Sequence, residues 1–294
     1  MACKVREHHI VGLLAAALLL GVACASGPPP ASLASWRDAV IATQAQSDVA
    51  LRGVNQLARE AELERAAQRA NLSESDFEPA LDAESLAVWH GTFDDLAAYA
   101  QTLAKLVDPA TSAGIGPSLT KLSETMAAQA SVEAFQRYPG LASAIGKLGS
   151  AIAAAAARAE AAQIMRETDA DVTALLDAMS KLIGDQEGGE EIGVLAVVRA
   201  AWTDRANEKR IQFLSAPNAD AKLRIAREYA ELLDKRSAAD RVLRDLKRSL
   251  ESLAASHTAA AQGNPSDLSS LIAMLGEQTR LAQSLVDDLR RPKP

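Results

Sequence analysis

The chain has very few aromatic residues and only two cysteines. Phe, Trp and Tyr together account for 3% of its 294 residues, and the cysteines are Cys3 and Cys24. Aromatic side chains favour strands, whereas alanine, which is abundant here, favours helices. The composition therefore predicts an all-α fold, held together by a hydrophobic core without a disulfide framework.

The chain also lacks the residue patterns on which most enzymes and metalloproteins depend. Beyond residue 23 it has only two histidines, His90 and His257, and it has no His-Glu-x-x-His motif, nucleophile elbow or phosphate-binding glycine loop. We therefore expect no catalytic residue, no metal ligand and no cofactor. We expect His90 to point outward and His257 to lie on the apolar seam of its helix. An enzyme with an unrecognised site is the alternative.

The distribution of charge argues against nucleic-acid binding. The formal net charge is −7, and an acidic protein repels the phosphate backbone. Lys222 to Arg248 is rich in basic residues, but acidic residues lie four positions away, as in Asp220 and Arg224 or Asp240 and Arg244, which predicts a self-paired, exposed helix face. The acidic segment 185–191 lacks the alternating ligands of a calcium loop and predicts a solvated turn.

The longest apolar run, Ile10 to Cys24, follows the basic residues Lys4 and Arg6 and precedes small residues and three prolines. This order is typical of an export signal, and the run is too short to span a bilayer comfortably as a retained helix. We predict that residues 1–23 are removed. Their removal takes away Cys3, so that Cys24 has no disulfide partner within the chain. It also changes the formal net charge from −7 to −8.

The end of the signal, Leu20-Gly21-Val22-Ala23-Cys24, resembles the lipobox of bacterial lipoprotein precursors. The resemblance implies lipid attachment to the thiol of Cys24, which becomes the new N-terminus, although Gly21 stands where the family usually carries leucine. Ala25 after the cysteine implies sorting to the outer membrane of a two-membrane bacterium. Alternatively, Ala23-Cys24-Ala25 fits ordinary signal peptidase, which would release a soluble periplasmic protein beginning at Ser26.

Clusters of glycine and proline divide the remaining chain into a tether over residues 24–31, a helical body over 32–290 and a tail over 291–294. Ser32 and Asn264 are the expected N-caps, and Gly184 is the expected C-cap. A short turn is expected between Ser73 and Pro79. About seven helices are expected: Ser32–Ala70, Ala83–Val107, Pro117–Arg137, Leu141–Ile183, Glu190–Ser215, Pro217–Gln262 and Pro265–Arg290.

Apolar residues recur every three or four positions along these helices, as in the seam of a coiled coil. Short connections make neighbouring helices antiparallel, so we expect an elongated antiparallel bundle with coiled-coil-like hairpins and a possible subdivision near 184–190. As one continuous helix, Leu141–Ile183 would be a rod about 65 Å long, a length that favours a hairpin or an extended bundle. The seams include Trp36, Val40, Thr43, Ser47, Ala50, Val54, Leu57 and Ala61; Leu86, Trp89, Phe93, Leu96, Ala100, Leu103 and Val107; and Ala239, Leu243, Leu246, Leu250, Leu253 and His257.

The segment Leu141–Ala157 is rich in glycine and alanine, and Lys147 is its only charged residue. We expect it to be buried between helices; the alternative is lipid contact in a pore-forming or membrane-remodelling bundle.

Together with the lipobox resemblance, the sequence predicts a lipid-anchored protein of the bacterial cell envelope that acts as a non-catalytic binding or scaffolding module. Its expected partners are the membrane, through the lipid, and either a second protein or another copy of itself, through the helical seams.

Overall fold

The computed structural model describes residues 30–67, 72–107, 115–156, 160–184, 193–263 and 269–290. All regular structure in these ranges is helical, which confirms the all-α prediction, with nine α-helices instead of the expected seven. The elements are α2 (Pro30–Ala66), η1 (Glu74–Phe77), α3 (Ala83–Val107), α4 (Ile115–Ala130), α5 (Glu133–Gln136), α6 (Pro139–Ala155), α7 (Ala161–Ile183), α8 (Val194–Ser215), α9 (Ala219–Ala261) and α10 (Ser269–Arg290).

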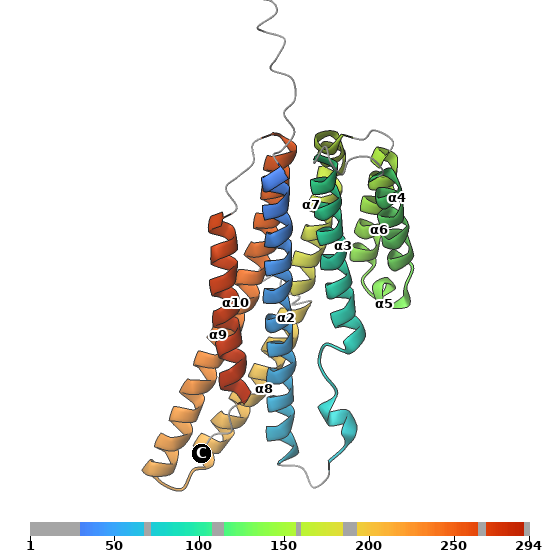
Figure 1. The fold of residues 1–294 in the computed structure, drawn as a ribbon. Coiled ribbons are helices and arrows are strands. Elements are labelled where there is room, and N and C mark those ends of the chain that lie inside the picture. The colour runs from blue at the N-terminus through green and yellow to red at the C-terminus, as the bar shows by residue number, and fades with distance from the viewer. Residues whose placement is uncertain are drawn as a thin grey trace, which may run out of the picture.

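The helices lie side by side in an elongated antiparallel bundle, as expected (Figure 1). Helices α2, α3, α7 and α9 form its centre. The pair α4 and α6 packs against α3 and α7 on one side, and α10 packs against α2 and α9 on the other. Helix α2 has 37 residues and α9 has 43, or about 55 and 65 Å at 1.5 Å per residue. These two helices therefore set the length of the molecule.

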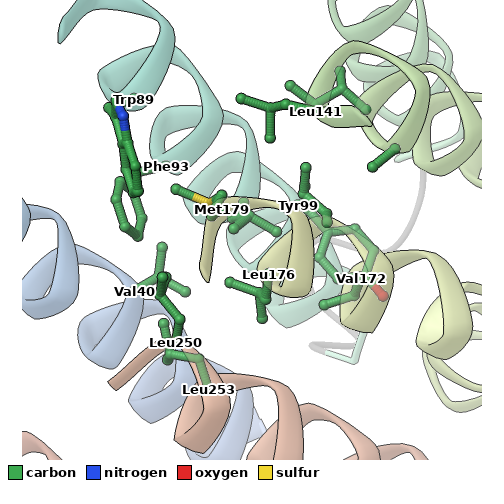
Figure 2. Close-up of a cluster of buried hydrophobic side chains, with 14 of the residues drawn as sticks. Val40, Trp89, Phe93, Tyr99, Leu141, Val172, Leu176, Met179, Leu250 and Leu253 are labelled. Carbon is green, nitrogen blue, oxygen red and sulfur yellow. The ribbon is translucent and has the colours of Figure 1, made fainter. Parts of the chain in front are cut away.

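A continuous apolar core fills the space between the helices (Figure 2). Val40 of α2, Phe93 of α3, Met179 of α7 and Leu250 of α9 meet there, and all four have 0% exposed surface. Because Val40, Phe93 and Leu250 lie on the predicted seams, spacing in the sequence indicated the buried faces. Every predicted seam residue of α2 and α9 is buried, and in α3 only Leu86 and Val107 are half-buried.

Helix α3 has the predicted bounds, and its first turn shows why it begins there. The carboxylate of Asp82 accepts a hydrogen bond from the backbone N–H of Ser85 at 2.7 Å, which satisfies a donor that the first helical turn leaves free. Asp82 also forms an ion pair with Arg137 at 3.0 Å. These two interactions, the amide contact first, hold the pKa of Asp82 below its ordinary value.

Two predicted helices are each divided in the structure. Leu141–Ile183 is not a single rod, because α6 ends at Ala155 and α7 begins after Glu160, whose backbone is extended with φ −122° and ψ 113°. The two helices pack against each other, which is the hairpin alternative. Pro117–Arg137 is likewise interrupted, since Val132 is extended, with ψ 139°, between α4 and α5.

The predicted ends of the helices are right in some places and shifted in others. Gly184 is the C-cap of α7, with φ 105°, as predicted. Ser32 is not an N-cap, because α2 already begins at Pro30, and the N-cap of α9 is Asn218, whose side chain accepts from the N–H of Ala221 at 2.9 Å. The subdivision near 184–190 stays a prediction, since residues 185–192 lie outside the described part; α7 and α9, on either side of it, pack together.

Candidate functional site

Several predicted features lie outside the described residues. They are the signal over residues 1–23, the lipid attachment residue Cys24, the acidic segment 185–191, the N-cap Asn264 and the tail over 291–294. Lipidation of Cys24 therefore stays a prediction. The described part of the chain contributes the bundle that follows it, with helix α2 beginning at Pro30.

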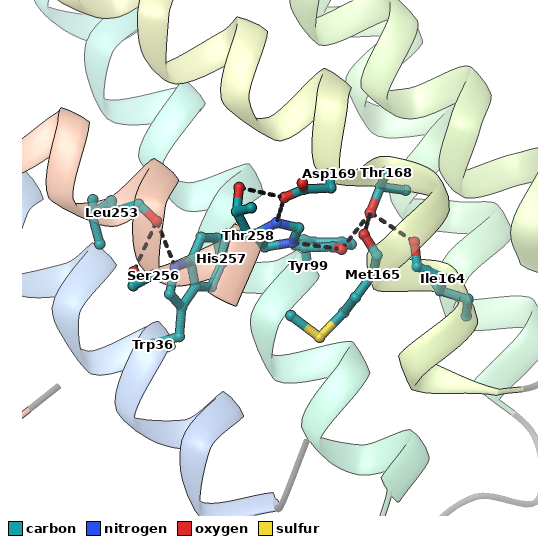
Figure 3. A network of polar contacts seen from close by, with 10 residues as sticks. All are labelled: Trp36, Tyr99, Ile164, Met165, Thr168, Asp169, Leu253, Ser256, His257 and Thr258. Carbon is teal, nitrogen blue, oxygen red and sulfur yellow. Dashed lines mark hydrogen bonds and ion pairs between the residues drawn. The ribbon is translucent and has the colours of Figure 1, made fainter. Parts of the chain in front are cut away.

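A buried polar network that includes a histidine, an aspartate and a tyrosine lies near the start of α2 (Figure 3). His257 of α9 lies at its centre, with Nδ1 at 2.8 Å from Asp169 Oδ1 of α7 and Nε2 at 3.1 Å from the hydroxyl of Tyr99 of α3. The Tyr99 hydroxyl is also hydrogen-bonded to Thr168 Oγ1 at 2.6 Å. Three helices thus meet through hydrogen bonds at one point in the core.

Trp36 brings α2 into the same network. Its indole N–H donates to the carbonyl of Leu253 at 3.2 Å, and its ring packs against the rings of His257 and Tyr99 at centroid distances of 5.2 and 6.2 Å. Aromatic contacts at these distances stabilise a core beyond the area that they bury. The network therefore fixes the relative positions of all four central helices.

The environment of the network determines the protonation of its members. Hydrogen bonds from His257 and Thr258 hold the pKa of Asp169 below its ordinary value, so this carboxylate is ionised and accepts the His257 Nδ1–H. Burial raises the pKa of Tyr99, which keeps the phenol protonated. The side chain of Asp169 is 25% exposed, and water reaches the network from this edge.

An aspartate, a histidine and a hydroxyl in series is also the arrangement of a catalytic charge relay. Such a relay acts only when its hydroxyl meets a substrate. Tyr99 and His257 have no exposed surface, so the hydroxyl is closed off from solvent. In this position the network joins α2, α3, α7 and α9, and we assign it a role in holding the bundle together.

His90, the other histidine, lies on the surface between α2 and α3. Its side chain is 48% exposed, as predicted, and its Nε2 lies 2.5 Å from Asp48 Oδ1. A second polar cluster lies between α2, α9 and α10, where Ser249 donates to Gln46 at 2.8 Å and Gln46 donates to Gln278 at 3.1 Å. This cluster positions α10 on the bundle.

The segment Leu141–Ala157 is packed in the interior along most of α6. Leu148 and Ile152 have 0% exposed surface. Gly149 approaches α4 so closely that an added Cβ would lie 3.1 Å from Met126 Cβ and 3.2 Å from the carbonyl oxygen of Ser123. The small residues therefore serve close helix packing, as the sequence predicts. None of the described helices combines the length and apolar character that a bilayer crossing requires.

The charged face of α9 pairs differently from the predicted pattern. Arg224 forms its ion pair with Glu228 at 2.7 Å, in the next turn, and not with Asp220. Arg244 donates to the backbone carbonyl of Asp240 at 3.2 Å. Within the described residues, no group of three or more histidine, cysteine or carboxylate side chains is placed to hold a metal ion.

A groove that the sequence analysis missed lies between α8 and α9. It has a volume of about 530 Å³, and its lining includes Phe213, Leu214, Ile225 and Tyr229. Leu214 is 80% exposed. The sequence did hold a signal for this groove: adjacent apolar residues lie close to Pro217 and belong to no continuous seam. A helix end outside the core must expose such residues.

The chain matches no protein-family model, no curated protein and no solved structure. The inference of function therefore depends on its own residues.

Proposed function

We propose that this protein is a lipid-anchored component of the bacterial cell envelope, at the outer membrane, whose helical body acts as a non-catalytic binding or scaffolding module. The lipobox-like sequence that ends at Cys24 carries the proposal. Helix α2 begins only six residues later, at Pro30. Six residues span at most about 20 Å, so a lipid on Cys24 would keep the bundle close to the membrane.

The arrangement of polar groups in the body supports a binding role over turnover. In the Asp169–His257–Tyr99 network, His257 and Tyr99 have no exposed surface, and only the Asp169 side chain, 25% exposed, reaches solvent. Its hydrogen bonds are all made between helices of the same bundle. In a bundle of this kind, the outer faces of the helices are the surface that a binding partner can reach.

The membrane-active alternative depended on Leu141–Ala157, and one face of α6, which holds most of that segment, is buried against α4 and α7. A protein released by ordinary signal peptidase is the other alternative, and it differs from the proposal in one respect, because it carries no lipid. This released form predicts that residue 24 is unimportant for membrane attachment, so the thiol of Cys24 separates it from the proposal. Dye release from liposomes by the purified body separates the membrane-active alternative.

Cross-linking in intact cells followed by mass spectrometry tests the tether and the partner together. The natural protein is compared with Cys24→Ala, and Cys3→Ala serves as the matched control because residue 3 lies in the predicted signal. We expect a stoichiometric envelope protein to be cross-linked to the natural protein and to Cys3→Ala, and to be lost from Cys24→Ala.

Two outcomes would contradict the proposal. If Cys24→Ala still sediments with membranes after a high-salt wash, the single lipid anchor is wrong, since salt removes electrostatic contacts but not an acyl chain. If only self and lipid cross-links appear, the protein acts on membranes or assembles with itself and is not a binding module for another protein.

A further inference from the structure

The end of the α8–α9 hairpin projects from the bundle, and side-chain contacts join its two helices. Only residues 216–218 separate Ser215 from Ala219. Lys209 of α8 forms an ion pair with Glu228 of α9 at 2.8 Å, and Arg210 donates to the Tyr229 hydroxyl at 3.3 Å. These contacts join the two helices about one to three turns before the end of the hairpin.

This hairpin continues beyond its contact with the last turn of α2 and diverges from that helix. Arg65, in the last turn of α2, forms an ion pair with Asp204 of α8 at 2.6 Å. From that level α8 continues for eleven residues to Ser215, or about 16 Å. In Figure 1 the α8–α9 hairpin diverges from α2 toward the bottom of the view, whereas α2 begins at the opposite end of the bundle.

The projecting end exposes an unusual number of large apolar side chains. Four of the eleven large apolar residues that are exposed in the described part of the chain lie within residues 211–223. Leu214 is 80% exposed, Ile211 67% and Leu223 51%. Apolar residues gathered in this way on a soluble surface mark a contact site. We call Ile211, Phe213, Leu214 and Leu223 the apolar tip.

The residues around the apolar tip carry a net positive charge in an otherwise acidic protein. Residues 209–229 carry five basic and two acidic side chains, whereas the whole chain has a net charge of −7. Lys222 lies over the Phe213 ring at 5.7 Å and Arg210 over the Tyr229 ring at 5.9 Å. Lysine, arginine and tyrosine are the side chains that bridge apolar and aqueous layers at a membrane surface.

We propose that the apolar tip inserts shallowly into an anionic bilayer surface. Anionic headgroups complement the basic residues of the hairpin, and the acyl layer takes up the apolar tip. A peptide seated in the α8–α9 groove would cover Phe213 and Leu214 but would leave Ile211 and Leu223, which are not among the groove's lining residues, exposed. Insertion of the end of the hairpin would bring all four into the acyl layer. Two tips meeting face to face would bring like charges together.

Vesicle sedimentation tests the proposal without the lipid anchor. The chain from residue 24 onward with Cys24→Ala, which contains every described residue, is mixed with vesicles of phosphatidylcholine alone or with added phosphatidylglycerol. We expect binding only to the anionic vesicles, and a marked loss of binding at high salt. Leu214→Asp in the same background should weaken binding about tenfold or more, because one leucine no longer enters the apolar layer.

Ile41→Asp is the matched control, since Ile41 is a 48% exposed apolar residue on α2, away from the tip. It should bind as the parent does, and circular dichroism should show the same helicity for all three proteins. The proposal is wrong if the parent does not bind anionic vesicles, or if both aspartate variants bind equally. It is also wrong if the parent is a dimer without lipid and Leu214→Asp is a monomer, because the tip would then be an interface between copies.

Discussion

Asp95 is a buried carboxyl group in the middle of α3, and replacing it with asparagine should change how stability depends on pH. Its side chain is 6% exposed, and Oδ2 has no hydrogen-bond partner among the described residues. Burial, with a smaller contribution from the charge of Asp94, raises the pKa of Asp95 from 3.8 to about 7. Ionisation of Asp95 is therefore unfavourable in the folded protein.

The size of the effect follows from the shift in pKa. Each pKa unit corresponds to about 1.4 kcal/mol, so a change of about three units gives roughly 4 kcal/mol, and structural relaxation reduces this to between about 2 and 4 kcal/mol. Because the folded protein binds the proton more tightly than the unfolded chain, this contribution is fully present below pH 4 and is lost as pH rises through 7. Asp95→Asn has no such charge to bury.

Urea unfolding followed by circular dichroism between pH 4.5 and pH 8.5 measures the difference. We expect Asp95→Asn to gain stability over the natural protein as pH rises, by about 2 kcal/mol or more at the alkaline end. Asp94→Asn is the control, since Asp94 is exposed, and it should change stability by about 0.5 kcal/mol or less. A difference between Asp95→Asn and the natural protein that stays constant across this range would refute the reasoning.

Two further predictions concern packing and the central network, and both are checked by the same urea titrations. Gly149→Ala should lower the free energy of unfolding by about 1–3 kcal/mol, because its Cβ would meet Met126 and the backbone of α4. Gly276→Ala is the control, because a Cβ at this position of α10 would meet nothing within 4 Å, and it should raise the free energy of unfolding by about 0.5–1 kcal/mol. If the two substitutions change the free energy of unfolding equally, the close approach at Gly149 is wrong. Tyr99→Phe should cost about 1–2 kcal/mol by leaving the buried His257 Nε2 without its partner, and no loss would mean that water replaces the hydroxyl.

Helix positions and buried faces were predictable because local signals and apolar spacing agree. Helix α3 has the bounds that the sequence predicts, since Asp82 caps its start and the seam from Trp89 to Leu103 continues without interruption. The break between α6 and α7 was not predictable, because residues 153–162 are mostly alanine, with no glycine or proline. Tertiary packing of α6 against α4 and α7 decides where that stretch turns back.

In the candidate sites too, the sequence predicts the position of a residue on its helix but not its partners from distant parts of the chain. His257 was placed correctly on its seam, but its partner Asp169 is 88 residues away in sequence. No spacing rule joins two residues so far apart, and only the packing of α7 on α9 brings them together. The apolar tip was missed for a different reason: the spacing of Ile211 and Leu214 fits a helix face, and the sequence alone does not show that the α8–α9 hairpin diverges from α2 there.

Mass spectrometry of the N-terminal peptide, purified from the membrane fraction, tests the central claim most directly. The account predicts a peptide that begins at Cys24 and carries acyl groups, with no peptide from residues 1–23. A mature protein that begins at an unmodified Ser26, or one that retains the residues before Cys24, would contradict the lipid anchor and with it the proposed function.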